Sequence, residues 1–198
     1  MNSEIDKPDQ KAELRARLVA ERERLHDHQR RQLDRRICVH LLRFLDDRDC
    51  INLAGFHAFR GEPDLMPALE ALHHAGRRVH LPVVNGQDMR FNRWTPGQAM
   101  QKNRFGIPEP VQGATCPPDR LEVVVMPLVA FSATGTRLGM GAGFYDRAFS
   151  FCLDHPDAGP MLVGAAYSLQ EINSLPAQSW DVPLDAVITD RGLQVFRE

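Results

Sequence analysis

The residues whose types and spacing can do chemistry gather in one stretch, residues 126–147, MPLVAFSATGTRLGMGAGFYDR. Gly139, Gly141 and Gly143 alternate there, and glycine lets backbone N–H groups approach a ligand closely. The stretch follows an apolar segment and precedes a predicted helix, whose N-terminus favours an anion. Arg137, at the start of the glycine pattern, can donate two parallel hydrogen bonds to phosphate oxygens. The pattern indicates a phosphate-binding loop.

A carboxylate follows the same loop. Asp146 falls in the first turn of the predicted helix, where it can hold a divalent cation that phosphates also bind. The loop differs from two common nucleotide loops, because no G-K-[ST] follows it and its glycines do not have the G-x-G-x-x-G spacing. A glycine triplet alone can be a tight turn, and a lone acid there can simply stabilise the helix. The neighbouring arginine, tyrosine and aspartate together favour a ligand site.

The string RLGMGAGFYDR resembles the motif R-L-G-x-G-x-G-[YF]-Y-D of the 5-formyltetrahydrofolate cyclo-ligase family. Further segments match motifs of that family in the same order along the chain. These are Lys11 and Arg15 on the first helix, residues 61–64 (GEPD), residues 105–110 (FGIPEP) and residues 180–185 (WDVPLD). The sequence departs from many members at Ala142, where they have glycine, and at Phe144, where they have tyrosine. We therefore expect an ordinary φ at position 142 and no hydroxyl role at position 144.

The resemblance implies an activity. Members of the family convert 5-formyltetrahydrofolate and ATP to 5,10-methenyltetrahydrofolate, ADP and phosphate, with Mg²⁺. Phosphorylation turns the formyl oxygen into a leaving group, and N10 then attacks the activated carbon. Such a reaction needs positioning and charge neutralisation rather than a protein nucleophile. No Ser-His-Asp or Cys-His pattern for a nucleophile is present.

The resemblance also implies site residues. For ATP they are Lys11, Arg15, Arg137, Leu138, Gly139, Met140, Gly141, Ala142, Gly143, Phe144 and Tyr145. For the folate they are His57, Glu62, Met140, Gly141, Ala142, Gly143 and Phe144. For Mg²⁺ they are Asp146 and Asp181. Without the family, Lys11 and Arg15 would be solvated surface charges, and Glu62 an acid in the first turn of a helix.

Hydrophobic patterning predicts the elements that must position these residues. Helices are expected at 9–25, 27–44, 63–76 and 144–153, with a long loop at 106–118. Strands are expected at 50–56, 78–84, 89–94, 121–126, 161–167, 186–189 and, at an edge, 192–196. This alternation favours a three-layer α/β fold, a mostly parallel twisted sheet with helices on both faces. The family's fold is similar to the sugar-phosphate isomerase and CoA-transferase group, which predicts ligands at the carboxyl ends of the strands.

Length and charge limit the remaining classes of function. The 198 residues suit a single domain, 1–198, in which 1–48 form a solvated helical arm that contributes to the nucleotide site. The net charge of −2 argues against nucleic-acid and membrane partners. The polar N-terminus predicts a cytoplasmic protein, and four cysteines without a C-x-x-C predict free thiols. We expect a monomer.

Two alternatives stay open on this fold. A non-catalytic module that senses a phosphorylated metabolite would keep the glycine loop but would not need both Asp146 and Asp181. An acyl or CoA transferase would need a glutamate nucleophile at a strand end, and no residue fits that role as well as Glu62 fits the folate.

Overall fold

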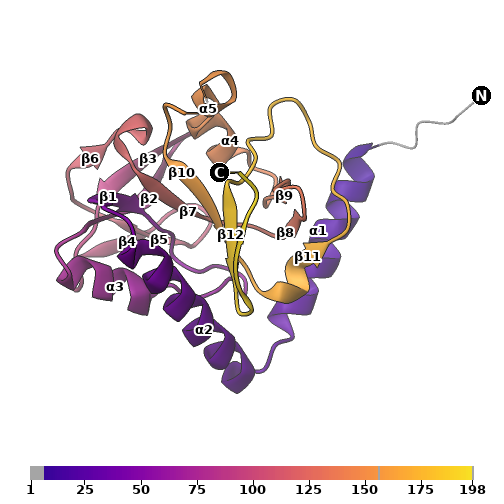
Figure 1. Ribbon diagram of the computed structural model, residues 1–198, viewed down its shortest axis with the longest axis horizontal. Coiled ribbons are helices and arrows are strands. Elements are labelled where there is room, and N and C mark those ends of the chain that lie inside the picture. The colour runs from indigo at the N-terminus through magenta and orange to yellow at the C-terminus, as the bar shows by residue number, and fades with distance from the viewer. Residues whose placement is uncertain (1–6, 156, 198) are drawn as a thin grey trace, which may run out of the picture.

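The computed structural model describes residues 7–155 and 157–197, and its centre is an eight-stranded sheet. The strand order is β13-β12-β10-β7-β1-β2-β3-β6 (Figure 1). The strands are β1 (Asn52–Ala54), β2 (Arg78–Asn85), β3 (Asp88–Arg93), β6 (Thr115–Cys116), β7 (Val123–Pro127), β10 (Met161–Ala165), β12 (Ala186–Thr189) and β13 (Gly192–Val195). The five central strands are parallel, while β13, β3 and β6 pair antiparallel at the two edges. The predicted mostly parallel sheet and its last edge strand are confirmed.

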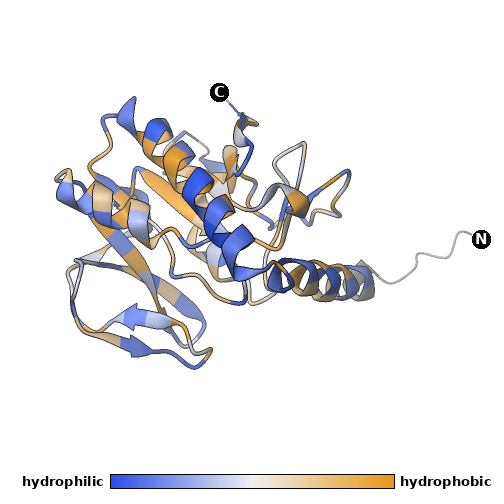
Figure 2. Ribbon diagram, turned by 90° about the horizontal axis from the view of Figure 1, so that it is seen from below, coloured by the Kyte–Doolittle hydropathy of each residue, from blue (hydrophilic) through white to orange (hydrophobic). Residues whose placement is uncertain are grey.

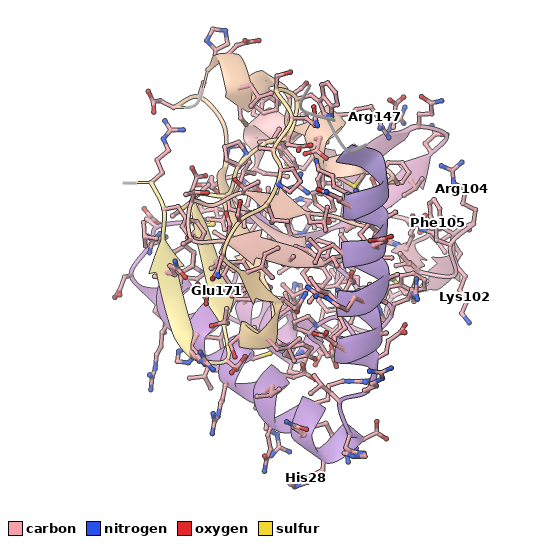
Figure 3. All side chains as sticks on the ribbon, turned by 90° about the vertical axis from the view of Figure 1, so that its right-hand side faces the viewer. His28, Lys102, Arg104, Phe105, Arg147 and Glu171 are labelled. Atoms are coloured by element: carbon pink, nitrogen blue, oxygen red, sulfur yellow. The ribbon has the colours of Figure 1, made fainter. Side chains whose placement is uncertain are left out.

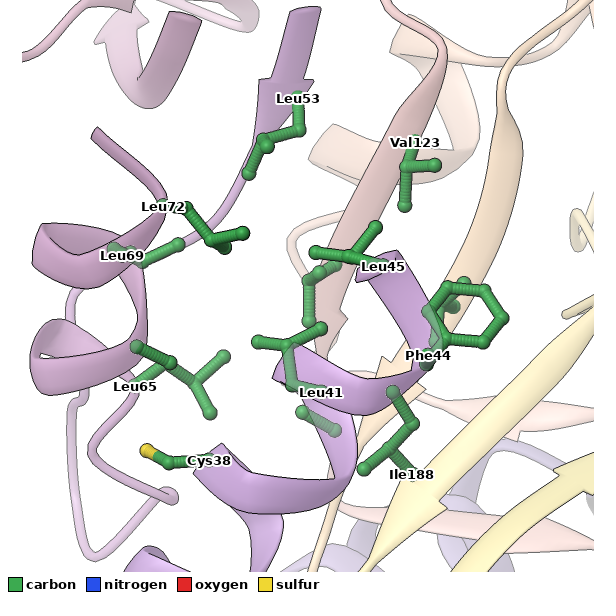
Figure 4. Close-up of a cluster of buried hydrophobic side chains, with 14 of the residues drawn as sticks. Cys38, Leu41, Phe44, Leu45, Leu53, Leu65, Leu69, Leu72, Val123 and Ile188 are labelled. Atoms are coloured by element: carbon green, nitrogen blue, oxygen red, sulfur yellow. The ribbon is translucent and has the colours of Figure 1, made fainter. Parts of the chain in front are cut away.

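Helices cover both faces of this sheet, as the three-layer fold requires. α2 (Asp27–Asp46) and α3 (Met66–His74) cover one face, and α4 (Phe144–Ala148) and α5 (Phe151–Asp154) lie against the other. Figure 4 shows the first face, where Leu41 and Leu45 of α2 pack toward Val123 of β7. The next residue, Val124, belongs to the core on the opposite face, because successive side chains of a strand alternate.

The first helix, α1 (Lys7–Glu23), packs away from the main sheet. It contacts a three-stranded sheet of β8 (Ala130–Ser132), β9 (Arg137–Leu138) and β11 (Glu171–Ile172). Leu18 and Val19 of α1 are buried there against Leu138. Figure 2 shows α1 extending from one side of the molecule. This packing places one helix face over the strand that leads into the glycine segment.

The prediction that residues 1–48 form a solvated arm is wrong for the second helix of that segment, α2. Ile37, Leu41 and Leu45 of α2 are buried in the core of the main sheet. Their spacing of four is what an amphipathic helix on a sheet face shows, so α2 belongs with the core rather than with α1. Residues 1–6 of the predicted arm lie outside the described residues.

Two other local predictions also fail. The loop predicted at 106–118 contains two short strands, β5 (Pro108–Pro110) and β6. Among the described strands, β5 pairs only with β4 (Met100–Lys102), and its prolines are tolerated because a strand with one neighbour does not need every backbone N–H for pairing. The helix predicted at 144–153 is two helices, because the buried Phe149 leaves helical geometry at φ −115°. The other predicted helices and strands are present with ends shifted by a few residues.

The described chain also settles two smaller points. No helix in it is both long and apolar enough to cross a membrane. The cysteines are free, with Cys38 and Cys50 buried and Cys116 and Cys152 half-buried, as expected.

Candidate active site

A cavity of about 950 Å³ opens at the carboxyl ends of three parallel strands. Its wall includes Phe56 and His57 after β1, Pro82 and Val84 near the end of β2, and Pro127 at the end of β7. Side chains at this edge come from loops, which can vary without disturbing the sheet. The cavity therefore lies where the fold prediction places a ligand.

Every residue that the sequence analysis assigns to a ligand lines this one cavity. The set comes from α1, from the turn after β1, from the stretch that runs from β9 into α4, and from the loop before β12. It comprises Lys11, Arg15, His57, Glu62, Arg137, Leu138, Gly139, Met140, Gly141, Ala142, Gly143, Phe144, Tyr145, Asp146 and Asp181. Which ligand each residue binds stays a prediction.

Three cations surround the glycine segment. Lys11 and Arg15 are four residues apart on α1, so they share a face of that helix. Lys11 Nζ lies 3.0 Å from Asp181 Oδ2, and Arg15 Nε donates to the Gly139 carbonyl oxygen at 2.8 Å. Arg137 Nη2 donates to Asp146 Oδ1 at 2.6 Å. This end of the cavity therefore concentrates positive charge beside exposed backbone.

Two glycines of the segment have conformations that other residues rarely adopt. Gly141 has φ +98° and Gly143 has φ +67°. A Cβ built on Gly141 would lie 3.5 Å from the Arg15 guanidinium carbon, so a larger side chain would fill the space between the segment and α1. Ala142 has no positive φ, which confirms the ordinary backbone expected where many family members have glycine. Arg147 Nη1 donates to the Ala142 carbonyl oxygen at 2.9 Å and so braces the segment from the other side.

Asp146 and Asp181 lie in adjoining segments. Asp146 Oδ1 accepts from the Val182 backbone N–H at 3.2 Å, next to Asp181 in the chain. Asp181 Oδ2 also accepts from the Gln178 N–H at 2.9 Å. The second oxygen of each carboxylate has no hydrogen bond to the described residues. The described chain has no cluster of three or more side chains that could hold a metal ion, and the assignment of this pair to Mg²⁺ stays a prediction.

Glu62 forms the opposite, buried end. Its side chain precedes α3 rather than lying in it, and the residue is 5% exposed. Oε2 accepts from the Phe59 N–H at 3.0 Å, and Oε1 lies 3.4 Å from Arg22 Nη2. Burial raises the pKa of Glu62 to about 7, because it disfavours the charged form more than Arg22 and the N–H stabilise it. Each oxygen keeps a lone pair for a further donor.

Arg22 supports the turn that carries Glu62, and the sequence reasoning gave it no role. Its side chain is fully buried, and its Nε and Nη1 donate to the carbonyl oxygens of Arg60 at 2.8 Å and Leu128 at 2.9 Å. Arg60 is the one non-glycine residue in the described chain with a positive φ, +50°, so the turn that carries Glu62 is held in an unusual conformation. A signal was available, because Arg22 is two turns beyond Arg15 on the same helix face.

Aromatic side chains line the mouth of the cavity. The Phe105 ring, from the loop between β4 and β5, meets the Phe144 ring edge to face at 5.9 Å between centroids. Arg104 lies over the Phe105 ring at 4.8 Å, and Arg147 over the Phe144 ring at 5.2 Å. Figure 3 shows Arg104, Phe105 and Arg147 on one side of α1. The sequence assigned no role to Phe105, although the FGIPEP motif contains it, or to Trp180, which is 64% exposed beside Asp181.

Comparison with known proteins decides the family. The sequence matches the 5-formyltetrahydrofolate cyclo-ligase family over residues 7–190. The chain belongs to this family. A 5-formyltetrahydrofolate cyclo-ligase of Haemophilus influenzae is 35% identical over 162 residues, which cover 79% of this chain and 84% of the relative. The enzyme of Escherichia coli K12 with that name is 41% identical over 142 residues, covering 69% and 76% of the two chains.

Solved structures support the same assignment. The NMR structure of Aquifex aeolicus 5,10-methenyltetrahydrofolate synthetase superimposes with a TM-score of 0.81 at 30% identity, covering 95% of this chain and 93% of that one. A 5,10-methenyltetrahydrofolate synthetase from Mycoplasma pneumoniae gives a TM-score of 0.73 at 27% identity, covering 91% and 98%. As a member of the cyclo-ligase family, the chain keeps its glycine motif in a segment that faces both α1 and the cavity.

Proposed function

We propose that this protein catalyses the ATP-dependent conversion of 5-formyltetrahydrofolate to 5,10-methenyltetrahydrofolate, with release of ADP and phosphate. The observation that carries the proposal is a single cavity that joins a cationic, glycine-rich end to a buried carboxylate. The reaction needs these two kinds of surface next to each other, because phosphate must pass from the nucleotide to the folate. Family membership and the names of the relatives agree with it.

The nucleotide is assigned to the cationic end. Lys11, Arg15 and Arg137 place positive charge around the phosphates, while the backbone of residues 138–145 approaches them closely where Gly141 and Gly143 leave room. The three cationic side chains are already held in place by oxygen atoms of the protein. Phosphate oxygens can therefore replace or join these partners, and no freely moving side chain has to become ordered. Little conformational entropy is then lost on binding.

The folate is assigned to the other end. A pterin offers a ring N–H and an amino group side by side, which one ionised carboxylate can accept together, and Glu62 is held for that contact by Arg22 and the Phe59 N–H. His57 lies on the same wall, and residues 140–144 face the shared space. N10 of the folate then attacks the carbon of the O-phosphorylated formyl group, and the bond from that carbon to the phosphorylated oxygen breaks as phosphate leaves.

Mg²⁺ is assigned to Asp146 and Asp181. When bound, the ion would neutralise charge on the phosphates and orient them for transfer. In each carboxylate one oxygen is fixed by Arg137 or Lys11 and by a backbone N–H, and the other has no hydrogen bond to the described residues. That arrangement orients each ligand without closing the site.

The two alternatives are less well supported. A transferase nucleophile must be accessible and unpaired, whereas Glu62 is 5% exposed and is bonded to Arg22. A sensor of a phosphorylated metabolite would leave the buried carboxylate without a partner of matching chemistry. The expectations of a monomer, a cytoplasmic location and no nucleic-acid or membrane partner stay predictions from the sequence.

The decisive experiment mixes the protein with 5-formyltetrahydrofolate, ATP and Mg²⁺. Near-ultraviolet absorption of the methenyl product should appear together with stoichiometric ADP. ATP hydrolysis without the absorption, or binding without turnover, would refute the ligase assignment and favour the sensor. Transfer of an acyl group from a CoA ester would favour the transferase.

The metal assignment has its own test. Asp146→Asn and Asp181→Asn each remove one charged oxygen ligand, so we expect the Mg²⁺ titration of activity to shift to higher concentration, about tenfold or more for each variant. Asp157→Asn is the matched control, because the Asp157 side chain is 94% exposed. If both site variants keep the wild-type titration curve, these carboxylates are structural.

A further inference from the structure

Unpaired polar atoms are concentrated at the active-site cavity. In the described part of the chain, five buried side-chain nitrogen and oxygen atoms lack a hydrogen-bond partner. Three of them, His57 Nδ1, Arg137 Nε and Tyr145 Oη, belong to residues that line the cavity. Buried polar groups are rarely left unpaired, because desolvation without a partner is unfavourable. Their grouping at one cavity indicates that a ligand supplies the missing partners.

Tyr145 lines the same cavity as the residues assigned to the nucleotide and to the folate. It is the second residue of α4, directly after the glycine segment, and its ring stacks on Phe149 at 6.4 Å between centroids. The Arg137 guanidinium lies 6.0 Å from the centre of the same ring. The Glu62 carboxylate and the Arg137 guanidinium both lie close enough for their charges to act on the hydroxyl.

The hydroxyl is already stripped of water. Burial raises the pKa of Tyr145 well above its ordinary value, so the group is a neutral donor. An oxygen atom that reaches this donor gains a hydrogen bond without displacing another protein partner. Such a bond is strongest to an oxygen that carries charge in a water-poor site.

We propose that Tyr145 is a catalytic residue whose hydroxyl donates a hydrogen bond to the phosphoryl group as it passes from ATP to the formyl oxygen; this rests on the proposed function. In that step the bond from the γ-phosphorus to the β,γ-bridging oxygen breaks, and its electron pair stays on ADP. A new bond forms between the phosphorus and the formyl oxygen, and Tyr145 keeps its proton. Negative charge is spread over the oxygens of the transferring group, where a fixed donor stabilises the transition state.

The second tyrosine of the chain provides a matched control. Tyr145 and Tyr167 are its two tyrosines. The Tyr167 hydroxyl donates to Asp34 Oδ1 at 2.7 Å in the core, away from the cavity. A change from tyrosine to phenylalanine thus removes a hydrogen bond of the free protein at position 167 but none at position 145.

The experiment compares Tyr145→Phe with Tyr167→Phe. Melting temperatures without ligands and steady-state kcat and KM are measured for both variants. For Tyr145→Phe we expect an unchanged or higher Tm, kcat lower by about 10- to 100-fold and little change in KM for the folate. For Tyr167→Phe we expect Tm lower by about 2–8 °C with normal kcat.

Each other outcome counts against the proposal. Wild-type kcat in Tyr145→Phe would show that the hydroxyl does not act in the reaction. A lowered Tm in Tyr145→Phe would show that the hydroxyl has a structural partner, and would overturn the argument from its unpaired state. Failure of the wild-type protein to form the methenyl product would refute the proposed function itself, whereas normal turnover in the variant refutes only the role of Tyr145.

Discussion

The two ends of the cavity differ in solvent exposure and in how their charged side chains are paired. At the glycine-rich end, Met140, Gly141 and Ala142 are exposed, and the ion pairs Lys11–Asp181 and Arg137–Asp146 are partly open to solvent. At the other end, Arg22 and Glu62 are buried together. The first end has accessible backbone and replaceable charge partners, whereas the second has one carboxylate in a nearly closed setting.

The difference matches the two ligands that are proposed for this cavity. A triphosphate is large, highly charged and hydrated, so a site for it needs many donors and an open path. A pterin edge is flat and neutral, so its recognition depends on a few donors and acceptors in fixed places. A buried carboxylate left with a missing partner is costly, so we expect the second end to be the more selective one. Arg22 links the two ends, because α1 carries it together with Lys11 and Arg15.

The largest effect is expected from a substitution in the glycine-rich end of the cavity. Gly141→Val places a branched side chain at φ +98°, 3.5 Å from Arg15 at its first carbon, and blocks backbone approach to phosphate. We expect the variant to fold and its rate of ATP turnover, measured by ADP release, to fall by at least about 100-fold.

Gly97→Val is the matched control for this change. Gly97 has φ +77° and open space around it, so the variant bears a similar backbone strain away from the cavity. Full activity in a folded Gly141→Val protein, or an equal loss in Gly97→Val, would contradict the assignment of the glycine segment to the nucleotide.

A smaller effect is expected from the buried end. Glu62→Gln replaces one acceptor with a donor and removes the charge, so one contact with the pterin edge becomes a clash between donors. Losing a charged hydrogen bond of this kind costs on the order of 1.5–3 kcal/mol, so folate affinity should fall about 10- to 100-fold while ATP affinity changes little. Isothermal titration with each ligand measures both. Weaker ATP binding with normal folate binding would show that Glu62 belongs to the nucleotide end and that its assignment to the folate is wrong.

The smallest effect tests the same carboxylate by pH. The pKa of Glu62 is raised to about 7 in the folded protein, so the ionised form that pairs with the folate grows as pH rises through that value. We expect KM for the folate to fall by up to about tenfold between roughly pH 6 and pH 8. Over roughly pH 5 to 7 the stability of the free protein should fall, because the unfolded chain has already lost this proton while the folded one still binds it.

Glu62→Gln also serves as the control for the pH experiment. The variant has no group to titrate at this position, so both pH dependences should flatten. A wild-type KM that does not change over this range, or a variant that keeps the full dependence, would show that another group controls folate binding.

The sequence by itself determined much of this description. The alternation of strands and helices identified the parallel sheet, the i,i+4 spacing put Lys11 and Arg15 on one helix face, and the glycine motif predicted a phosphate-binding segment. These features are local, since a periodic pattern or a glycine spacing specifies the geometry of neighbouring residues. The resemblance to the family added Glu62, from the motif after β1, and Asp181, from the motif before β12, to the predicted site residues.

The tertiary structure decided the rest. It buried Arg22 against Glu62, 40 positions apart in the chain, and left the hydroxyl of Tyr145 without a partner while that of Tyr167 found Asp34. It also placed α2 in the core and brought the β4–β5 loop to the mouth of the cavity. Whether a charge or hydroxyl is buried, paired or orphaned depends on which distant segments pack around it, and no spacing within one segment contains that information.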